Sequence, residues 1–381
     1  MRVAFVYDAI YPYVKGGVEK RVYELGRRLA ARGHEVHWFG LKWWDGDSVL
    51  ERGGIVYHGV CRPLPLYTSS GRRSILEALW FSLSLIVPLS RRDDFDLIDC
   101  QSFPYFPCFP CRVASWLKGV PLVVTWHEVW GSYWGRYLGF FGFLGRLVER
   151  MVSRLTCDNV AVSDTTRDLL VGLGVSESNV VAVSNGVDLE YINSIPPSEK
   201  KFDVLFVGRL IKDKNVDVLL RAFSDVISHL PGASMCIVGD GPERSNLVSL
   251  ASELGLDDAV VFLGFRNDHD DVVSLMKSSK IYVSPSTREG FGLSVLEALS
   301  CSVPVLVVDD VLNASDELIT DDVNGYVGPL SPGFFSEKII NILSDNKLRN
   351  RLSEAAIKST EKNSWDCVVE KLADYYSNTL S

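Results

Sequence analysis

The run Ser284–Leu299, SPSTREGFGLSVLEAL, carries carboxylates and glycines at a spacing that suits sugar and phosphate chemistry. Glu289 precedes Gly290 and Gly292, and Glu297 follows on an expected helix. Open backbone amides and the positive dipole at a glycine-rich helix start suit an anion such as a diphosphate. Carboxylates accept hydrogen bonds from hydroxyls but repel phosphate. The segment therefore predicts a ligand with hydroxyls at both ends and phosphates in the middle, which is a nucleotide sugar.

Two motifs add positive charge and close backbone approach. Arg209 and Lys212 or Lys214 follow an expected strand, where a guanidinium fork and an ammonium suit diphosphate oxygens. Ion pairing with neighbouring acids is the alternative. Gly16 and Gly17 lie between the first expected strand and helix, where open α/β sheets bind ligands. A flexible turn explains this pair equally well, and it is not the GxGxxG fingerprint of dinucleotide binding.

Two further residues each have a structural and a functional interpretation. His127 ends an expected strand and can donate to a phosphate or sugar oxygen near neutral pH, or it can be structural. Ser294-Val-Leu-Glu297 also fits a capping box, in which Glu297 satisfies a helix amide. Glu289 lies before the helix, where a cap is less natural. Motifs that suit a phosphate follow expected strands in both halves of the chain, which favours the functional interpretation of these residues.

Strands alternate with helices along the chain, which predicts parallel, doubly wound sheets. The alternation restarts after a proline-containing linker, Ser194–Lys201. The prediction is therefore an N-terminal Rossmann-like domain over 1–195 that binds the acceptor and a C-terminal one over 196–363 that binds the donor. A last amphipathic helix, within 364–381, is expected to pack back on the first domain. The expected strands lie at 2–8, 34–39, 96–100, 120–125, 160–162, 180–183, 202–207, 234–238, 260–263, 281–284 and 303–308.

Composition restricts the function class. The 381 residues, 47% apolar and 23% charged, are typical of a globular protein of two domains. Residues 1–195 hold 21 Lys and Arg against 20 Asp and Glu, whereas the remainder holds 18 against 28. The acidic second half argues against a nucleic-acid partner. The longest apolar stretch, Ile75–Leu89, contains Glu77 and Pro88 and is too short to span a bilayer. A cytoplasmic protein is expected.

Eight cysteines are scattered along the chain, and only Cys108 and Cys111 have metal or redox spacing. No second pair or histidine cluster completes a zinc site, so buried free thiols are expected.

At this point the chain resembles the retaining glycosyltransferases of family 4. Their GT-B fold has two Rossmann-like doubly wound domains that face a central cleft. The E-x7-E spacing of Glu289 and Glu297 is among the more specific marks. The other segments that carry the resemblance are GGVEK, VVTWHE, VSNGVDLE, FVGRLIKDKN, IVGDGPER, FLGF, EGFGLSVLEAL, NGYV and the tail SWDCVVEKLADYY.

The resemblance implies a role for each candidate residue. Arg209 and Lys214 would hold the donor diphosphate, Glu289 the hydroxyls of the donor sugar, Glu297 the ribose, and His127 would lie beside the transferred sugar. The catalytic set is then His127, Glu289, Arg209 and Lys214. The donor-binding set is Gly16, Gly17, Arg209, Lys214, Glu289, Gly290, Phe291, Gly292, Leu293, Ser294 and Glu297. One departure is that Asp309–Glu317 lacks the glycine pair that the family often shows there.

The expected function is therefore retaining transfer of a sugar from a nucleotide-diphosphate sugar to a glycan or lipid-linked acceptor, in polysaccharide, glycolipid or glycoprotein-glycan assembly. The resemblance implies no metal, and no cofactor beyond the nucleotide sugar is expected. A nucleotide-sugar epimerase of the same fold and a catalytically silent scaffold subunit are the alternatives.

An aromatic segment over 126–143, followed by arginines, bears on the acceptor. Such a segment can lie at the inner face of the cell membrane or stack on a glycan, and an aromatic helix packed into the first domain explains it equally well. The residues are Trp126, Trp130, Tyr133, Trp134, Tyr137, Phe140, Phe141 and Phe143, with Arg146, Arg150 and Arg154.

Overall fold

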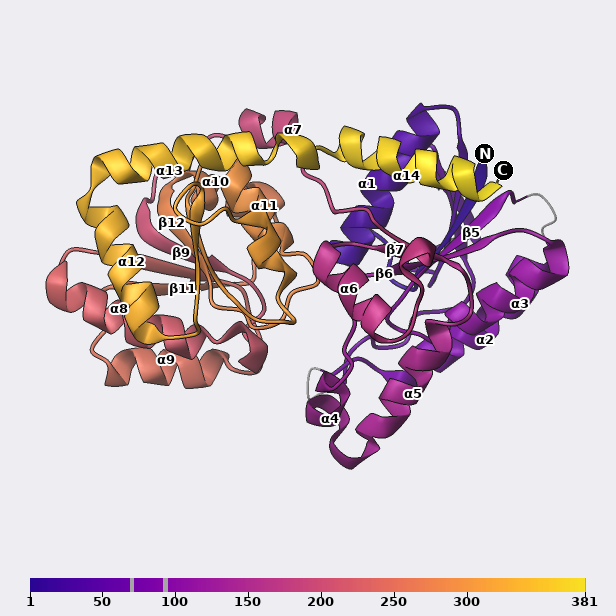
Figure 1. Cartoon of the computed structure of the whole chain (residues 1–381), viewed down its shortest axis with the longest axis horizontal. Helices are drawn as coiled ribbons and strands as arrows, with labels where there is room; N and C mark the ends of the chain where they lie inside the picture. The colour runs from indigo at the N-terminus through magenta and orange to yellow at the C-terminus, as the bar shows by residue number, and fades with distance from the viewer. Residues whose placement is uncertain (69–71, 92–94, 381) are drawn as a thin grey trace. The chain divides into compact units, whose positions relative to one another are not determined.

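A computed structural model describes residues 1–68, 72–91 and 95–380, and the chain forms two compact units (Figure 1). Unit 1 comprises Met1–Asn185 with Trp365–Ser381, and unit 2 comprises Gly186–Ser364. Each unit contains one sheet with helices around it, and each has its own apolar core. Both are α/β units of the doubly wound kind that the alternation predicts.

The sheet of unit 1 has eight strands in the order β3-β4-β2-β1-β5-β6-β7-β8. All neighbours pair in parallel except β3 with β4. The central strands β1, β5 and β6 are buried almost throughout, as expected where helices cover both faces of a parallel sheet. The strands are β1 Arg2–Val6, β2 Glu35–Gly40, β3 Val49–Arg52, β4 Ile55–Gly59, β5 Leu97–Gln101, β6 Leu122–Trp126, β7 Asp158–Ala161 and β8 Val180–Ala182.

The helices of unit 1 include one from the far end of the chain. Helix α14 packs on α1, and Asp366 forms ion pairs with Arg28 (3.7 Å) and Arg32 (3.0 Å). The return of the last helix to the first domain is thus as expected. The helices are α1 Gly17–Ala31, α2 Ile75–Arg91, α3 Cys108–Lys118, α4 Tyr133–Leu138, η1 Gly139–Phe141, α5 Gly142–Val152, α6 Asp164–Gly172, η2 Glu177–Asn179 and α14 Trp365–Leu380.

The sheet of unit 2 has six parallel strands in the order β11-β10-β9-β12-β13-β14. The strands are β9 Phe202–Val207, β10 Met235–Val238, β11 Val260–Gly264, β12 Ser279–Ser284, β13 Val305–Val308 and β14 Gly325–Gly328. The helices are α7 Leu189–Ser194, η3 Lys212–Lys214, α8 Val216–His229, α9 Arg244–Glu253, α10 His269–Lys277, α11 Leu293–Ser300, η4 Ala314–Leu318, α12 Pro332–Ser344, α13 Asn346–Ser359 and η5 Glu361–Asn363.

Unit 1 ends ten residues earlier than the predicted boundary at 195. Arg21 of α1 donates to the carbonyl of Val183 and to Asn185 Oδ1, both at 2.9 Å, and so keeps the chain in unit 1 through residue 185. The segment 194–201, predicted as the linker, belongs to unit 2 and is held on α10, where Lys277 Nζ donates to the carbonyl of Ile195 at 2.6 Å and Ser274 Oγ to the carbonyl of Pro196 at 2.8 Å. Prolines here mark a packed turn of unit 2 rather than a flexible connection.

Within the described ranges, no helix combines the length and the apolar character needed to cross a membrane.

Candidate active site

The predicted cations and carboxylates of unit 2 follow two neighbouring strands, β9 and β12. The chain runs from β9 outward to β10 and β11 and then returns to β12 on the other side of β9. Ligands of doubly wound sheets bind outside the carboxyl ends of the strands at such a reversal. Arg209 follows β9, and Glu289 follows β12. Both therefore emerge at the position where a ligand is expected.

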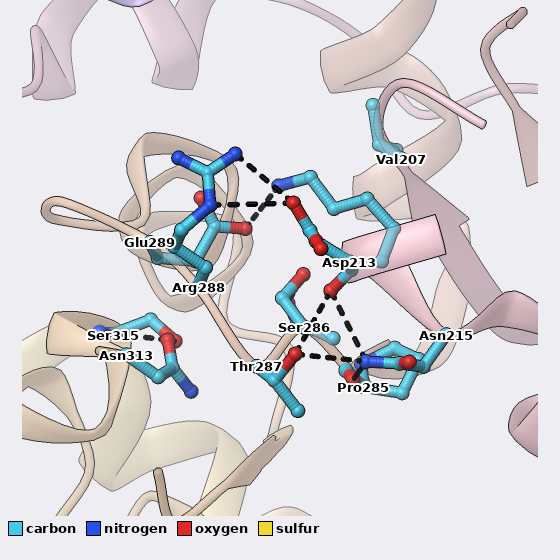
Figure 2. A network of polar contacts seen from close by, with 12 residues as sticks. Val207, Asp213, Asn215, Pro285, Ser286, Thr287, Arg288, Glu289, Asn313 and Ser315 are labelled. Carbon is cyan, nitrogen blue, oxygen red and sulfur yellow. Dashed lines mark hydrogen bonds and ion pairs between the residues drawn. The ribbon is translucent and has the colours of Figure 1, made fainter. Parts of the chain in front are cut away.

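Asn215 joins the two loops that follow these strands (Figure 2). Its Nδ2 donates to the carbonyl of Asp213 at 3.1 Å and to the carbonyl of Pro285 at 3.0 Å. The amide of Thr287 also donates to the carbonyl of Asp213, at 3.0 Å. Asn215 has a left-handed backbone, with φ +46°, a conformation that asparagine tolerates better than most residues. These bonds fix the position of Lys214 relative to the loop that carries Glu289.

Lys214 and Glu289 form an ion pair in which both side chains are largely shielded from solvent. The adjacent residues pair in the same way, since Arg288 donates to Asp213 Oδ2 at 3.1 Å. The alternative interpretation of the sequence was that these cations pair with acids. It is confirmed for Lys214, whose partner is the predicted site residue Glu289. Arg209 is exposed and has no ion pair with any residue in the described part of the chain.

The loop after β13 holds the main chain of Glu289. The Glu289 amide donates to the carbonyl of Leu312 at 2.9 Å, and the Ala314 amide donates to the Glu289 carbonyl at 2.8 Å. Buried Asn313 anchors this loop, because its Nδ2 donates to the carbonyl of Val308 at 2.6 Å and its Oδ1 accepts from Ser315. The segment 309–317 lacks the glycine pair, yet it forms an ordered support for Glu289 through this asparagine.

Gly292 is the N-cap of α11 and has a left-handed φ of +89°. A Cβ at Gly292 would lie 2.5 Å from Ser315 Cβ, so the close packing of the two loops requires glycine. Helix α11 begins at Leu293, and Ser294 is its second residue. The capping-box interpretation of Ser294 is therefore wrong. Gly290, half-buried, and Phe291, buried, lead into this helix start, as the sequence predicted.

Glu297 lies on α11 and is buried apart from a small exposed fraction. Its Oε1 is 3.2 Å from Nε2 of His269, the first residue of α10. The His269 ring stacks on Tyr191, with 6.1 Å between ring centroids. His269 was missed from the sequence, because a single histidine between acidic residues carries no signal of its spatial partner. It is positioned to orient the Glu297 carboxylate.

His127 lies in unit 1, directly after β6, and is half-buried. Gln101 Nε2 donates to Asp99 Oδ1 at 2.8 Å, which leaves Gln101 Oε1 to accept from His127 Nε2 at 2.9 Å. Burial, with a contribution from the Arg21 charge, lowers the pKa of His127 to about 3. The ring is thus neutral with its proton on Nε2 and an unprotonated Nδ1. The prediction that His127 donates to a ligand is therefore wrong, because the free nitrogen accepts.

The Asp99 carboxylate, which orients Gln101 and through it His127, is fully buried. It accepts from Thr125 Oγ1 at 2.8 Å and from the Tyr376 hydroxyl of α14. Burial raises the pKa of Asp99 to about 6, and these hydrogen bonds oppose the rise. The last helix of the chain thus helps to orient His127 through Asp99 and Gln101.

Gly16 and Gly17 are exposed at the start of α1, with Gly16 as the N-cap. The buried Glu19 carboxylate packs on Gly16, where a Cβ would meet its Oε2 at 2.7 Å. The glycine here provides room for an internal carboxylate as well as open backbone. Arg209, Lys214, Glu289, Glu297 and the α11 start belong to unit 2, whereas His127, Gly16 and Gly17 belong to unit 1.

Cys108 and Cys111 are buried free thiols, as expected, and burial raises the pKa of Cys111. Cys100 Sγ lies 3.5 Å from Cys108 Sγ. The described residues contain no group of three or more His, Cys, Asp or Glu placed to hold a metal ion.

Comparisons with known proteins decide the family. The family described as Glycosyltransferase Family 4 matches residues 15–191, and the family described as Glycosyl transferases group 1 matches residues 188–359. The chain belongs to the family 4 glycosyltransferases. The two matches meet at 188–191, close to the start of unit 2.

Named relatives span most of this glycosyltransferase. It is 30% identical to 2-deoxystreptamine N-acetyl-D-glucosaminyltransferase of Streptomyces fradiae, over 76% of this chain and 74% of that protein. It is 28% identical to phosphatidyl-myo-inositol mannosyltransferase of Mycobacterium leprae, over 98% and 96%. The structure of Anabaena HepE in complex with UDP and glucose matches with a TM-score of 0.78 at 20% identity, over 99% and 100%. The predicted GT-B fold with two Rossmann-like domains is confirmed.

Proposed function

We propose that this glycosyltransferase moves a hexose from a nucleotide-diphosphate sugar to a glycan or lipid-linked acceptor, with retention of the anomeric configuration and without a metal ion. The reaction would serve polysaccharide, glycolipid or glycoprotein-glycan assembly. We include peripheral contact with the inner face of the cell membrane in this proposal.

The observation that carries the proposal is that the Lys214–Glu289 pair and the unpaired Arg209 both follow strands at the reversal of unit 2. Two cations here suit a diphosphate, and Arg209 is available to it without breaking an ion pair. Glu289 suits the hydroxyls of the donor sugar, and hydrogen bonds from the loops after β9 and β13 keep its own loop in one place. Glu297, oriented by His269, suits the ribose hydroxyls.

The relatives support this choice of donor and acceptor. HepE was solved with UDP and glucose, which suggests a nucleotide sugar here. The Mycobacterium leprae relative is named for transfer to phosphatidyl-myo-inositol, which suggests a lipid-linked acceptor. A family 4 member with these residues is expected to use ligands of the same classes.

The chemistry that we propose needs no covalent intermediate on the protein. The bond between the anomeric carbon and the donor phosphate breaks, the acceptor oxygen attacks from the same face, and a phosphate oxygen of the leaving group takes the acceptor proton. Arg209 and Lys214 would stabilise the negative charge that develops on the leaving diphosphate, which is the role that a metal ion has in other transferases. His127 Nδ1 would accept a hydrogen bond from a sugar hydroxyl and orient it.

Release of free nucleotide tests the proposal. The protein is incubated with a panel of nucleotide sugars and a membrane-lipid and glycan extract, and the product linkage is analysed by NMR. We expect nucleotide release with one donor, a product that keeps the donor's anomeric configuration, and the same rate after chelation with EDTA. An inverted product, a rate abolished by EDTA, or isomerisation of the donor without acceptor would each contradict it.

A matched pair of variants ties the activity to the site. Glu289→Gln should reduce nucleotide release by about 100-fold or more, because it removes the charged hydroxyl acceptor and leaves Lys214 unpaired. Glu253→Gln, on the exposed end of α9, should leave the rate unchanged. Full activity of Glu289→Gln would show that the chemistry lies elsewhere.

A further inference from the structure

Helices of unit 1 expose an unusual number of large apolar side chains. Leu76, Trp116 and Phe140 are 76%, 74% and 85% exposed. We refer to the whole set as the apolar surface. It comprises Ile75, Leu76, Leu79, Trp80, Leu83, Ile86 and Val87 of α2, Val113, Trp116 and Leu117 of α3, and Phe140, Phe141, Phe143, Leu144, Leu147 and Met151 of η1 and α5.

Helix α2 is apolar on two opposite faces. One face, with Phe81, Leu85 and Leu89, is fully buried in the core of unit 1. The residues of α2 in the apolar surface recur every three or four positions on the other face, where a surface helix normally carries charges. An exposed patch of this kind marks an interaction surface.

The helices that bear the apolar surface are contiguous. Helix α2 packs along α3, and Lys118 Nζ donates to the carbonyl of Ser90 at 3.4 Å where the two helices end. At the other end of α2, the Arg73 amide donates to the Tyr137 hydroxyl of α4 at 2.9 Å. Arg112 of α3 and Arg154, just after α5, line one hollow of about 330 Å³. Figure 1 shows α2, α3 and α5 along the same edge of unit 1.

The exposed charges on these helices have one sign. Their two acids, Glu77 and Glu149, are both fully buried, and Glu149 accepts hydrogen bonds from the Tyr105 hydroxyl and the Trp130 amide, each at 2.7 Å. In the described residues of α2 to α5 and their immediate flanks, the solvent-exposed charged residues are all arginines: Arg72, Arg91, Arg112, Arg136, Arg146, Arg150 and Arg154.

The aromatic segment therefore divides into two parts. Trp126, Trp130 and Trp134 are buried in the core, as the packing alternative predicted. Phe140 and Phe141 point into solvent within the apolar surface. The packing interpretation is confirmed for these tryptophans, whereas a membrane or glycan contact of Phe140 and Phe141 stays a prediction.

We propose that the apolar surface docks unit 1 on an anionic phospholipid bilayer. Phenylalanine, tryptophan and leucine side chains enter the boundary between headgroups and acyl chains, and the surrounding arginines pair with lipid phosphates. Because the solvent-exposed charges in the described residues of α2 to α5 are all positive, an anionic bilayer complements this surface in charge as well as in apolar character. This locates the membrane contact of the proposed function on particular helices.

The segment that leads into α2 connects the apolar surface to the sheet of unit 1. Arg73, two residues before α2, forms an ion pair with the buried Asp8, which follows β1. Strand β1 lies at the strand reversal of unit 1, where β5 follows on its other side. A bilayer under α2 would thus present a lipid-linked acceptor near the carboxyl edge of this sheet. Only this last step depends on the proposed function.

Flotation of the purified full chain with lipid vesicles tests the docking. Vesicles of phosphatidylcholine alone are compared with vesicles of phosphatidylcholine mixed with phosphatidylglycerol, without any sugar donor. We expect the protein to float with the mixed vesicles and at least about tenfold less with the neutral ones, because each arginine near an anionic surface adds attraction. The attraction should weaken as salt is added.

Two sets of variants identify the surface. Leu76→Ser/Leu83→Ser/Trp116→Ser and Arg146→Gln/Arg150→Gln should each reduce binding to the mixed vesicles by about tenfold or more. The matched controls in unit 2, Val248→Ser/Phe265→Ser and Arg221→Gln/Arg244→Gln, replace residues that are also exposed and should bind as the parent does. Unchanged melting temperatures show that the variants fold.

Several results would overturn the docking. These are equal binding of the surface variants and the parent, no binding to either vesicle, or a dimer in light scattering that the triple variant converts to a monomer. Vesicle binding requires no sugar transfer, so it stands or fails separately from the activity. Nucleotide release with no vesicle binding would overturn the docking and the membrane contact but leave the proposed sugar transfer standing, and vesicle binding with no nucleotide release would overturn only the proposed sugar transfer.

Discussion

At the scale of single residues, the exposed Arg209 and the shielded Lys214 differ in their electrostatic surroundings. Arg209 has no ion pair among the described residues, whereas Lys214 is paired with Glu289 before any ligand binds. A diphosphate would therefore gain the full attraction of Arg209 and would compete with Glu289 for Lys214. The two cations are expected to differ in what their loss does to the enzyme.

Arg209→Ala should raise the KM for the donor by about tenfold or more, since a guanidinium–phosphate contact is charge-assisted. Steady-state kinetics of nucleotide release measure the effect. Arg221→Ala, an exposed arginine on α8, is the matched control and should keep the parent KM. Equal kinetics for Arg209→Ala and the parent would remove Arg209 from the donor site.

The lowered pKa of His127 leads to a prediction about how the stability of unit 1 depends on pH. Its native pKa of about 3 lies below the usual value near 6.5, so the unfolded chain binds a proton there that the native protein does not. This residue therefore lowers the stability of unit 1 progressively as the pH falls from about 7 toward 3. His127→Gln should lose less stability over that range than the parent does, as measured by melting at each pH. A parent and variant with parallel pH dependences would contradict the half-buried, neutral histidine.

At the scale of elements, the approach of two loops fixes the start of α11. Gly292→Ala places a Cβ 2.5 Å from Ser315 Cβ at a backbone φ of +89°. We expect a loss of about 1 to 3 kcal/mol of stability and reduced nucleotide release, because the loop that carries Glu289 must move. Thermal melting and kinetics measure both effects.

Gly255→Ala separates the clash from the backbone strain. Gly255 has a φ of +70°, and no atom lies within 4 Å of its added Cβ. This variant should show the strain alone, with unchanged activity. If Gly292→Ala is no worse than Gly255→Ala in either measurement, the packing against Ser315 does not matter.

Much of the fold could be predicted from the sequence. Strands β9 and β12 each contain an apolar run, 204–207 and 281–283, and the predicted Phe202–Val207 coincides with β9. The prediction omitted β3, β4 and β14. Strand β3, VLER, is largely exposed, and β14, GYVG, is half glycine, so neither has the apolar pattern of a buried strand. Strands of this kind are recognised only when a neighbouring strand pairs with them.

The sequence predicted which residues form the candidate site but not which of them contact one another. Two motifs could be recognised from the sequence because they lie beside apolar strands and glycines. They are the spacing of Glu289 and Glu297 and the cations after β9. The Lys214–Glu289 pair, the His269–Glu297 contact and the Asp99–Gln101–His127 chain join residues far apart in sequence. Spacing carries no information about such contacts. The apolar surface was missed for a similar reason, since the sequence does not say which side of α2 the core covers.

At the scale of the whole molecule, unit 1 depends on a helix that follows unit 2 in the chain. Trp365, Val369, Leu372 and Tyr376 of α14 are buried in the core of unit 1. A chain ending at Ser364 should therefore lose several kcal/mol of unit 1 stability, at about 1.5 to 3 kcal/mol for each large apolar side chain exposed. Unit 2 should be unaffected.

Tryptophan fluorescence measures this directly, because all nine tryptophans lie in unit 1 and eight remain in the shortened chain. We expect the fluorescence transition to shift to lower denaturant concentration, while a second transition seen only by circular dichroism stays in place. Tyr376→Phe, which removes only the hydroxyl that donates to Asp99, should shift the fluorescence transition much less. An unchanged fluorescence midpoint in the shortened chain would show that α14 adds nothing to unit 1.

The position of α14 also determines the order in which the two units can finish folding on the ribosome. Domains usually fold as they emerge, with the N-terminal one first. Here residues 365–380 emerge only after the whole of unit 2, so unit 2 has all of its residues before unit 1 does. Until then, nascent unit 1 lacks the helix that covers part of its core and the tyrosine that hydrogen-bonds to Asp99. In this enzyme the second domain of the sequence is the first that can be completed during translation.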